Sequence, residues 1–491
     1  MIIGDLQSAP RERCPTGLIG LDNVLGGGLL RDAVFIVQGS PGSGKTIFGN
    51  QVAFNVARRG GRVLYLTMVG ESLGRMVGQL SNLSFYNPSE IMKSLFYLSG
   101  YSAIARDGVD GLLELIAVEA RGHEVSMVVL DGLFVVSEIF DSDQDFRKFI
   151  NALTHQAELL RCTMLLMTNS ARTSSSPEYA MVDGWIELGT SHRGRLSCRF
   201  IEIHKFRGSD FVSGRHSLSI TNDGIVVYPR VEAVMGFDPG RGIQDGRLTT
   251  GIDGLDKMLR GGLPNVSTTL LTGAPGVGKT SFGLQFLSRC TTDHRGLYFG
   301  FYETVERLIV KTRTLGIDLE ALLESGAVRI IWYPPTENLI DELGHRLVNH
   351  VRDHHIRRVV LDGIGPLHRA TPEAENIGGF LAALTNELRA LGCSAILTAE
   401  SPTLEGGSEV TFGDMSAVAE NIITLQYAQV ETAEHRTIKV LKLRDSTFDA
   451  ATHTIRISSA GLQVGKAHRR PAPGSRHSVP GSPRAASEVD R

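Results

Sequence analysis

The stretch GSPGSGKT runs from Gly39 to Thr46, and the near-copy GAPGVGKT runs from Gly273 to Thr280. Each has the spacing Gly-x-x-x-x-Gly-Lys-Thr, follows an apolar run and precedes a helix-like segment. Glycines at these places let backbone N–H groups turn inward around an anion, and the positive end of the next helix favours negative charge. The pattern therefore predicts two loops that cradle nucleotide phosphates.

Every residue of the two loops is a candidate nucleotide contact. They are Gly39, Ser40, Pro41, Gly42, Ser43, Gly44, Lys45 and Thr46, and Gly273, Ala274, Pro275, Gly276, Val277, Gly278, Lys279 and Thr280. In this motif the lysine reaches the β- and γ-phosphates, and the threonine hydroxyl contacts Mg²⁺. ATP with Mg²⁺ is the expected ligand. A Gly-rich turn that merely joins a strand to a helix is the alternative, and the repeated context disfavours it.

The two loops belong to a longer internal repeat. Thr16–Asp32 matches Thr250–Asn265, and Lys279 follows Lys45 by 234 positions. Later segments match in the same order: Val128–Phe134 with Val359–Gly365, and His204–Phe211 with Leu441–Phe448. We interpret this as a tandem duplication of a domain of about 230 residues. The expected division is domains over 1–230 and 248–465, a Gly-rich linker over 231–247 and a disordered tail over 466–491.

The expected fold class is α/β. Short apolar runs such as Ala33–Gln38, Val266–Thr272 and Thr163–Thr168 alternate with helix-like segments. That alternation predicts, in each domain, a mostly parallel twisted sheet flanked by helices. Ligands of such sheets bind at the carboxyl ends of the strands, where both Gly-rich loops begin.

Composition sets the broad class. The chain has 491 residues, 42% of them apolar, and a formal net charge of −3. This balance makes nucleic acid an unexpected partner, and no apolar stretch is long enough to predict a membrane span. The five cysteines never form a Cys-x-x-Cys pair, which favours a reducing compartment. We expect a soluble, cytoplasmic protein. The segment after Val464 is rich in Pro, Gly, Ser and Arg, which is typical of disorder.

Two aspartates end buried-strand candidates downstream of the loops. Asp131 closes VVLD in the first repeat, and Asp362 closes VVLD in the second. A carboxylate there suits a role in holding Mg²⁺ together with Thr46 and Thr280. Taken alone, each aspartate is better explained as a cap of the next turn, and the paired phosphate loops favour the magnesium role.

Hydrolysis also needs a group that orients or deprotonates water. Glu71 and Glu303 follow the second apolar run of their repeats, but Glu71 comes after a turn that is one residue longer. We consider both as catalytic candidates beside Lys45 and Lys279. A helix-capping role for either glutamate remains open.

With these motifs in place, the chain resembles the KaiC branch of the RecA-like ATPases. The resemblance rests on TGLIGLDNVLGGGL and TGIDGLDKMLRGGL, the paired P-loops, the LDG strand ends, and KFRG and KLRD near the repeat ends. It implies two stacked RecA-like tiers in a homohexameric ring with ATP between subunits. It also implies that Lys205 and Arg207, and Lys442 and Arg444, reach a neighbour's ATP.

The sequence departs from the family pattern at two places. Where the family has two adjacent glutamates, the second repeat has Tyr302 and Glu303. The family's second domain is a serine/threonine autokinase, and the two acceptor positions hold Ser416 and Ala417 here. Ser416 is therefore the phosphoacceptor candidate, with Thr411 a weaker one, and a two-site phosphorylation cycle is not expected.

Three functions are compatible with these residues. The first is an ATP-hydrolysing signalling ring with autokinase activity and a protein partner. The second is a ring that binds ATP as a scaffold or sensor without hydrolysis. The third is a DNA-acting motor, which the acidic loop from Glu400 to Asp414 disfavours because acidic loops repel phosphates.

Overall fold

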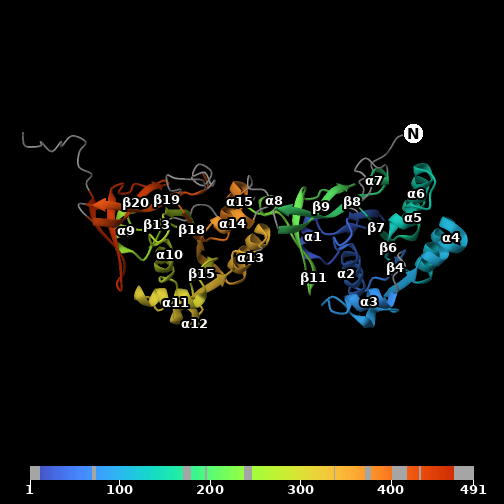
Figure 1. Cartoon of the computed structure of the whole chain (residues 1–491), viewed down its shortest axis with the longest axis horizontal. Coiled ribbons are helices and arrows are strands. Elements are labelled where there is room, and N and C mark those ends of the chain that lie inside the picture. The colour runs from blue at the N-terminus through green and yellow to red at the C-terminus, as the bar shows by residue number, and fades with distance from the viewer. Residues whose placement is uncertain are drawn as a thin grey trace, which may run out of the picture. The chain divides into compact units, whose positions relative to one another are not determined.

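The computed structural model describes residues 12–68, 73–169, 178–193, 196–236, 246–336, 338–370, 377–400, 417–430 and 433–468. The chain forms two compact units, each containing one nine-stranded sheet (Figure 1). The first unit comprises Met1–Gly240, Pro335–Asp353 and Pro366–Leu391. The second comprises Arg241–Pro334, His354–Gly365 and Gly392–Arg491.

The sheet of the first unit has the strand order β11-β10-β9-β8-β3-β7-β6-β4-β5. Neighbours from β8 to β5 are parallel, and β8 to β11 form an antiparallel meander. The strands are β3 (Val34–Gly39), β4 (Val63–Thr67), β5 (Leu95–Ser99), β6 (Met127–Asp131), β7 (Thr163–Asn169), β8 (Gly184–Arg193), β9 (Leu196–Phe206), β10 (Arg215–Thr221) and β11 (Gly224–Tyr228), with β1 (Arg13–Cys14) and β2 (Leu29–Leu30) forming a separate pair.

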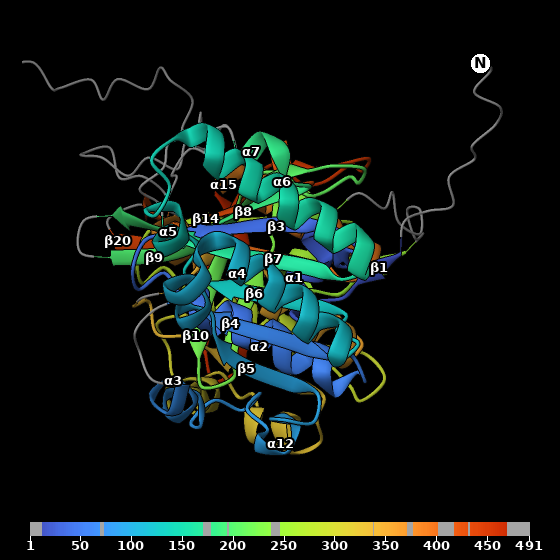
Figure 2. The ribbon, with the colours of Figure 1, turned by 90° about the vertical axis from the view of Figure 1, so that its right-hand side faces the viewer.

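Helices cover both faces of this sheet, because its central strands are apolar on both sides. Along β3, Phe35 and Val37 belong to one core cluster with residues of α2, while Val34 and Ile36 belong to another with residues of α4 and α6. Figure 2 shows α4 and α6 lying across the strands. The helices are α1 (Ile19–Val24), α2 (Lys45–Arg58), α3 (Leu73–Leu80), α4 (Tyr101–Gly122), α5 (Leu133–Ser137), α6 (Asp143–Leu160), α7 (Glu178–Met181) and α8 (Val231–Val234), with a 3₁₀ turn η1 (Pro88–Glu90).

The sheet of the second unit repeats the same order, as β16-β15-β17-β18-β14-β19-β20-β21-β22. Its strands are β14 (Thr268–Gly273), β15 (Arg295–Gly300), β16 (Val328–Trp332), β17 (Ile356–Asp362), β18 (Ser394–Glu400), β19 (Asn421–Val430), β20 (Ala433–Leu443), β21 (Thr452–Ser458) and β22 (Gly461–His468), with a separate pair β12 (Arg247–Leu248) and β13 (Leu263–Pro264). The later helices are α9 (Asp253–Met258), α10 (Lys279–Leu287), α11 (Val305–Thr314), α12 (Leu319–Glu324), α13 (Ile340–Asp353), α14 (Gly365–Ala370) and α15 (Ile377–Ala390). The predicted α/β class with two RecA-like sheets is confirmed.

Two helices of the second repeat belong to the first unit. Helices α13 and α15 pack against α8, and α13 also contacts β11. Asp341 of α13 accepts hydrogen bonds from Ser217 Oγ at 2.7 Å and from the Val231 backbone N–H at 3.1 Å. The repeat pattern in the sequence did not indicate this grouping.

The ends of the second repeat differ in detail from expectation. The segment taken as a linker from Val231 begins with the short helix α8, because Val231 is buried in the first unit. Strand β22 continues to His468, past the boundary expected at 465, since it stays paired with β21 up to the Thr452–His468 pair. Residues 469–491, where a disordered tail was expected, lie outside the described residues.

Candidate nucleotide site

Both Gly-rich loops connect the carboxyl end of a central strand to a helix. The first runs from β3 to α2, and the second runs from β14 to α10. Gly42 and Gly44 have φ of 81° and 102°, and Gly276 and Gly278 have φ of 74° and 117°. A side chain is strained at such angles, so these four positions explain the glycines of the motif.

The loop lysines fold back over their own loops. Lys45 Nζ donates to the carbonyl oxygens of Gly39 at 2.7 Å and Ser40 at 3.1 Å. Lys279 Nζ makes the equivalent bonds to Gly273 at 2.8 Å and Ala274 at 3.0 Å. Partial burial lowers the pKa of both lysines. Each ammonium group therefore lies beside the loop backbone that is expected to hold phosphate.

Inside the first loop, one polar atom has no protein partner among the described residues. Ser43 Oγ is buried and makes no hydrogen bond there, although unsatisfied buried hydroxyls are rare. A phosphate oxygen at the loop would be a suitable acceptor for it. In the second loop the equivalent position is the buried Val277, so this donor is absent from the second site.

The predicted metal residues come together in both repeats. Thr46 Oγ1 donates to Asp131 Oδ2 at 3.1 Å, and Thr280 Oγ1 donates to Asp362 Oδ2 at 2.8 Å. Both aspartates are 9% exposed and end the strands β6 and β17. A hydroxyl and a carboxylate oxygen are hard ligands of the kind Mg²⁺ prefers, so these residues fit the ion.

Sequence reasoning missed two tyrosines at these aspartates. Tyr65 Oη donates to Asp131 Oδ2 at 2.9 Å, and Tyr298 Oη donates to Asp362 Oδ2 at 2.5 Å. Each lies two residues before the end of the strand next to that of its aspartate, within an apolar run, so the sequence pattern indicated only a core residue.

The two catalytic glutamate candidates have different outcomes. Glu71 lies outside the described residues. Glu303 lies between β15 and α11, and its carboxylate pairs with Lys311 of α11 at 2.6 Å. The two side chains are 27% and 31% exposed, respectively. Glu303 therefore has a cationic partner that the sequence reasoning did not consider.

A further carboxylate, that of Glu400, lies beside the second phosphate loop. Glu400 ends β18 and is paired in register with Gly273, the first residue of the loop. Its charge opposes the burial that lowers the pKa of Lys279. In the first unit the residue in register with Gly39 is Asn169, which is neutral, so the two loops differ in local charge.

The basic pairs near the repeat ends contact backbone carbonyls of their own unit. Lys205 Nζ donates to Tyr179 and Ala180 at 2.9 and 2.7 Å, and Arg207 donates to Ala180 at 2.6 Å. In the second unit, Lys442 Nζ donates to Ala419 at 2.8 Å. Arg444 lies 3.9 Å from the carboxylate of Asp445. Their expected reach to a neighbour's ATP remains a prediction. Ser416 and Thr411 lie outside the described residues.

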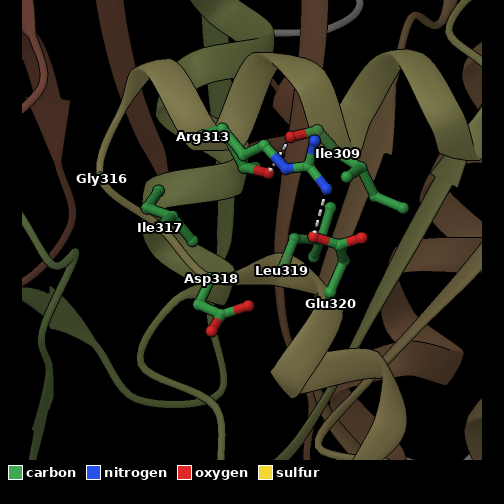
Figure 3. A pocket seen from close by; sticks show the side chains of 8 residues that line it. Ile309, Arg313, Gly316, Ile317, Asp318, Leu319 and Glu320 are labelled. Carbon is green, nitrogen blue, oxygen red and sulfur yellow. Dashed lines mark hydrogen bonds and ion pairs between the residues drawn. The ribbon is translucent and has the colours of Figure 1, made fainter.

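A hollow of about 350 Å³ lies away from the phosphate loops. It is lined by residues of α11, α12 and the turn between them, and no residue of either phosphate loop lines it. Figure 3 shows Arg313 facing Glu320 there, an exposed ion pair of 2.7 Å. The hollow therefore carries no part of the nucleotide site.

One other cluster has the side chains of a metal site. Possible ligand atoms of Glu187, Glu202 and His204 lie within 4.8 Å of one another on β8 and β9. His204 already pairs with Glu187 at 2.6 Å, and Arg215 pairs with Glu202 at 3.1 Å. The His204–Glu187 hydrogen bond and the Arg215–Glu202 ion pair account for the cluster. Within the described part of the chain, no helix is long and apolar enough to span a membrane.

The fold and the two loops define a tandem P-loop ATPase of the RecA-like class. The family model of the KaiC ATPase matches the chain twice, over residues 14–232 and 248–469. The chain therefore belongs to the KaiC ATPase family.

Curated relatives are similar over nearly their whole length. A circadian clock oscillator protein KaiC of Parathermosynechococcus lividus is 26% identical over 98% of this chain and 89% of its own length. The circadian clock protein KaiC3 of a Synechocystis strain is 26% identical over 93% of this chain and 92% of its own. A KaiC of a Picosynechococcus strain is 24% identical over 92% and 89%, respectively. The expected family is thus confirmed.

Proposed function

We propose that this KaiC-like ATPase binds ATP with Mg²⁺ at both P-loops and that the two sites use it differently. The observation that supports this most strongly is the repeated contact of a loop threonine with a strand-ending aspartate, at 3.1 and 2.8 Å. Bound Mg²⁺ would neutralise charge on the β- and γ-phosphates. Lys45 and Lys279 supply the loop cations, and Thr46, Thr280, Asp131 and Asp362 hold the ion.

The two sites differ in the residues around the phosphates. The first has Ser43 in the loop and Asn169 beside it, whereas the second has Val277 and Glu400. In the second, Glu303 is paired with Lys311. We infer that the second site hydrolyses ATP more slowly, because an ion-paired carboxylate is less available to water.

Steady-state ATP turnover of Lys45→Ala and Lys279→Ala tests the proposal. We expect each change to lower turnover, with Lys45→Ala removing the larger share. If neither variant loses turnover while wild-type protein still binds ATP, the protein is a nucleotide-dependent scaffold or sensor instead of an enzyme.

We further propose that the second domain transfers the γ-phosphoryl group to the Ser416 hydroxyl. The support is the position of Ser416 in the sequence, a few residues before β19 begins at Asn421, where the family pattern has its acceptor pair. Incubation with γ-labelled ATP should label the wild-type chain, and Ser416→Ala should remove the label. Thr411→Ala is the matched control and should keep it. An unlabelled wild-type chain would exclude autokinase activity.

Finally, we propose that the chain acts as a homohexamer that signals to a protein partner. The support is family membership, together with the basic pairs Lys205–Arg207 and Lys442–Arg444, which suit a phosphate supplied by a neighbouring subunit.

A further inference from the structure

Each strand-ending aspartate shares one carboxylate oxygen between two hydroxyl donors. Asp131 Oδ2 accepts from Thr46 and from Tyr65, and Asp362 Oδ2 accepts from Thr280 and from Tyr298. The tyrosines are 0% and 1% exposed. The same contact thus occurs twice in one chain, in surroundings that otherwise differ.

The tyrosines are placed by sheet register. Tyr65 on β4 pairs with Val129, two residues before Asp131, and Tyr298 on β15 pairs with Val360, two residues before Asp362. A phenol keeps its proton near neutral pH, so each tyrosine hydroxyl is a donor to its aspartate.

In the first unit the tyrosine is itself held by a chain of polar groups. Asn50 Nδ2 donates to Tyr65 Oη at 3.1 Å and to the Thr46 carbonyl at 2.8 Å. Tyr97 Oη donates to Asn50 Oδ1 at 2.7 Å. This series of hydrogen bonds connects strand β5 to Thr46 and Asp131.

Among its described residues, the second unit has no equivalent series of hydrogen bonds. It holds Asp362 through the other carboxylate oxygen, Oδ1. Leu284 occupies the position of Asn50, and Ile330 is in register with Tyr298 as Tyr97 is with Tyr65. Instead, Thr398 Oγ1 donates to Asp362 Oδ1 at 2.7 Å and accepts from the Gly363 N–H at 2.7 Å. The first unit has Met167 in that place, which cannot donate.

An aspartate carboxyl group needs such partners, because its terminal torsion has a broad, two-fold preference. Groups that bind a metal-holding carboxylate orient it, and their loss commonly weakens metal binding by about 10- to 100-fold. We propose that Tyr65 and Tyr298 are positioning residues that orient Asp131 and Asp362 for Mg²⁺, with Asn50–Tyr97 supporting the first site and Thr398 the second. This inference rests on the proposed binding of ATP with Mg²⁺.

In the test, nucleotide binding at each site is measured in a full-length chain whose other phosphate loop has lost its lysine. Tyr298→Phe is made with Lys45→Ala, and Tyr65→Phe is made with Lys279→Ala. Binding of a fluorescent ATP analogue is measured across Mg²⁺ concentrations and also in EDTA. We expect the Mg²⁺ concentration at half-effect to rise about 10-fold, while affinity in EDTA changes less than about 2-fold.

Two further variants separate positioning from packing. Thr398→Val should raise the Mg²⁺ requirement of the second site alone, and Asn50→Leu should raise that of the first alone. Tyr228→Phe is the control, because it removes a hydroxyl from β11, at the opposite end of the sheet from β5.

The outcomes are distinct. An unchanged Mg²⁺ requirement in both tyrosine variants overturns the inference. So does an equal loss of affinity with Mg²⁺ and in EDTA, because that result indicates a packing role. If the parent chains bind no nucleotide under any condition, the proposed function itself fails.

Discussion

At the scale of single residues, the ion pair between Glu303 and Lys311 decides how the second site is interpreted. The sequence presented Glu303 as the second repeat's candidate for activating water, and its partner eight positions later on α11 was not considered. Helix α11 begins at Val305 and turns Lys311 back toward the loop, at 2.6 Å from the carboxylate. A carboxylate held by an ammonium group has a fixed direction and is less free to approach a water molecule.

Lys311→Ala should therefore raise ATP turnover at the second site. The reason is that Glu303 becomes free to approach water at the phosphate end. Turnover is measured with Lys45→Ala present, so that only the second site contributes, and an increase of a few-fold is expected for the loss of one partly exposed ion pair. Arg313→Ala is the control, because it breaks the exposed pair with Glu320 on the same helix. Turnover that stays level or falls would show that Lys311 does not restrain Glu303.

At the scale of elements, the strands were the most predictable part. Central strands such as β3, β6 and β17 are apolar on both faces, so their composition identifies them without knowledge of their neighbours. The edge strands β5 and β16 were not predicted. In β16 the exposed Arg329 interrupts the apolar run, since one face of an edge strand is less covered.

The packing of α13 in the first unit buries a carboxyl group, that of Asp341. Asp341 lies in the first turn of that helix, and burial raises its pKa to about 6. The hydrogen bonds from Ser217 and Val231 and the charge of Arg230 oppose this shift, while Glu232 adds to it. Because the folded pKa exceeds the unfolded one, the folded state binds more protons between about pH 4 and pH 6. The free energy of unfolding then falls as pH rises through this window, by about 2 to 3 kcal/mol.

Asp341→Asn should remove this pH dependence. The variant mimics the protonated side chain, so it should be more stable than wild type at pH 7.5 and nearly equal to it at pH 4. Denaturant unfolding of both proteins at the two pH values checks this, and taking the difference between them cancels the contributions of other groups such as His345. Asp353→Asn, at the exposed end of α13, is the control. A difference that does not vary with pH would exclude titration of Asp341 as the cause.

At the scale of the whole molecule, the shared site is the central prediction. Lys205 and Arg207 donate to backbone carbonyl groups of α7 in their own unit. If they complete a neighbour's site, then a chain without Arg207 and a chain without Lys45 should restore each other. The first supplies the intact loop and the second supplies the intact cation.

We therefore expect mixtures of Arg207→Ala and Lys45→Ala chains to regain turnover that neither has alone. Both carry Lys279→Ala, so that only the first site is measured, and they are mixed before ATP is added. A mixture no more active than its components would place Arg207 outside a shared site.

The oligomeric state is tested separately. Light scattering of the wild-type protein with an ATP analogue and Mg²⁺ should give the mass of six chains.

The sequence by itself determined the repeat, the phosphate loops and the central strands. These features depend on local chemistry: glycines at positive φ, a lysine and threonine at set spacing, and apolar runs long enough for a buried strand. Only the tertiary structure decided the partners of the key groups. Tyr65, Tyr298 and Thr398 reach their aspartates through strand register. Lys311 reaches Glu303 from the second turn of α11, and α13 and α15 belong to the first unit. Apart from the Glu303–Lys311 pair, these contacts join residues far apart in the chain, and an apolar run looks the same whether or not one of its hydroxyls meets a buried carboxylate.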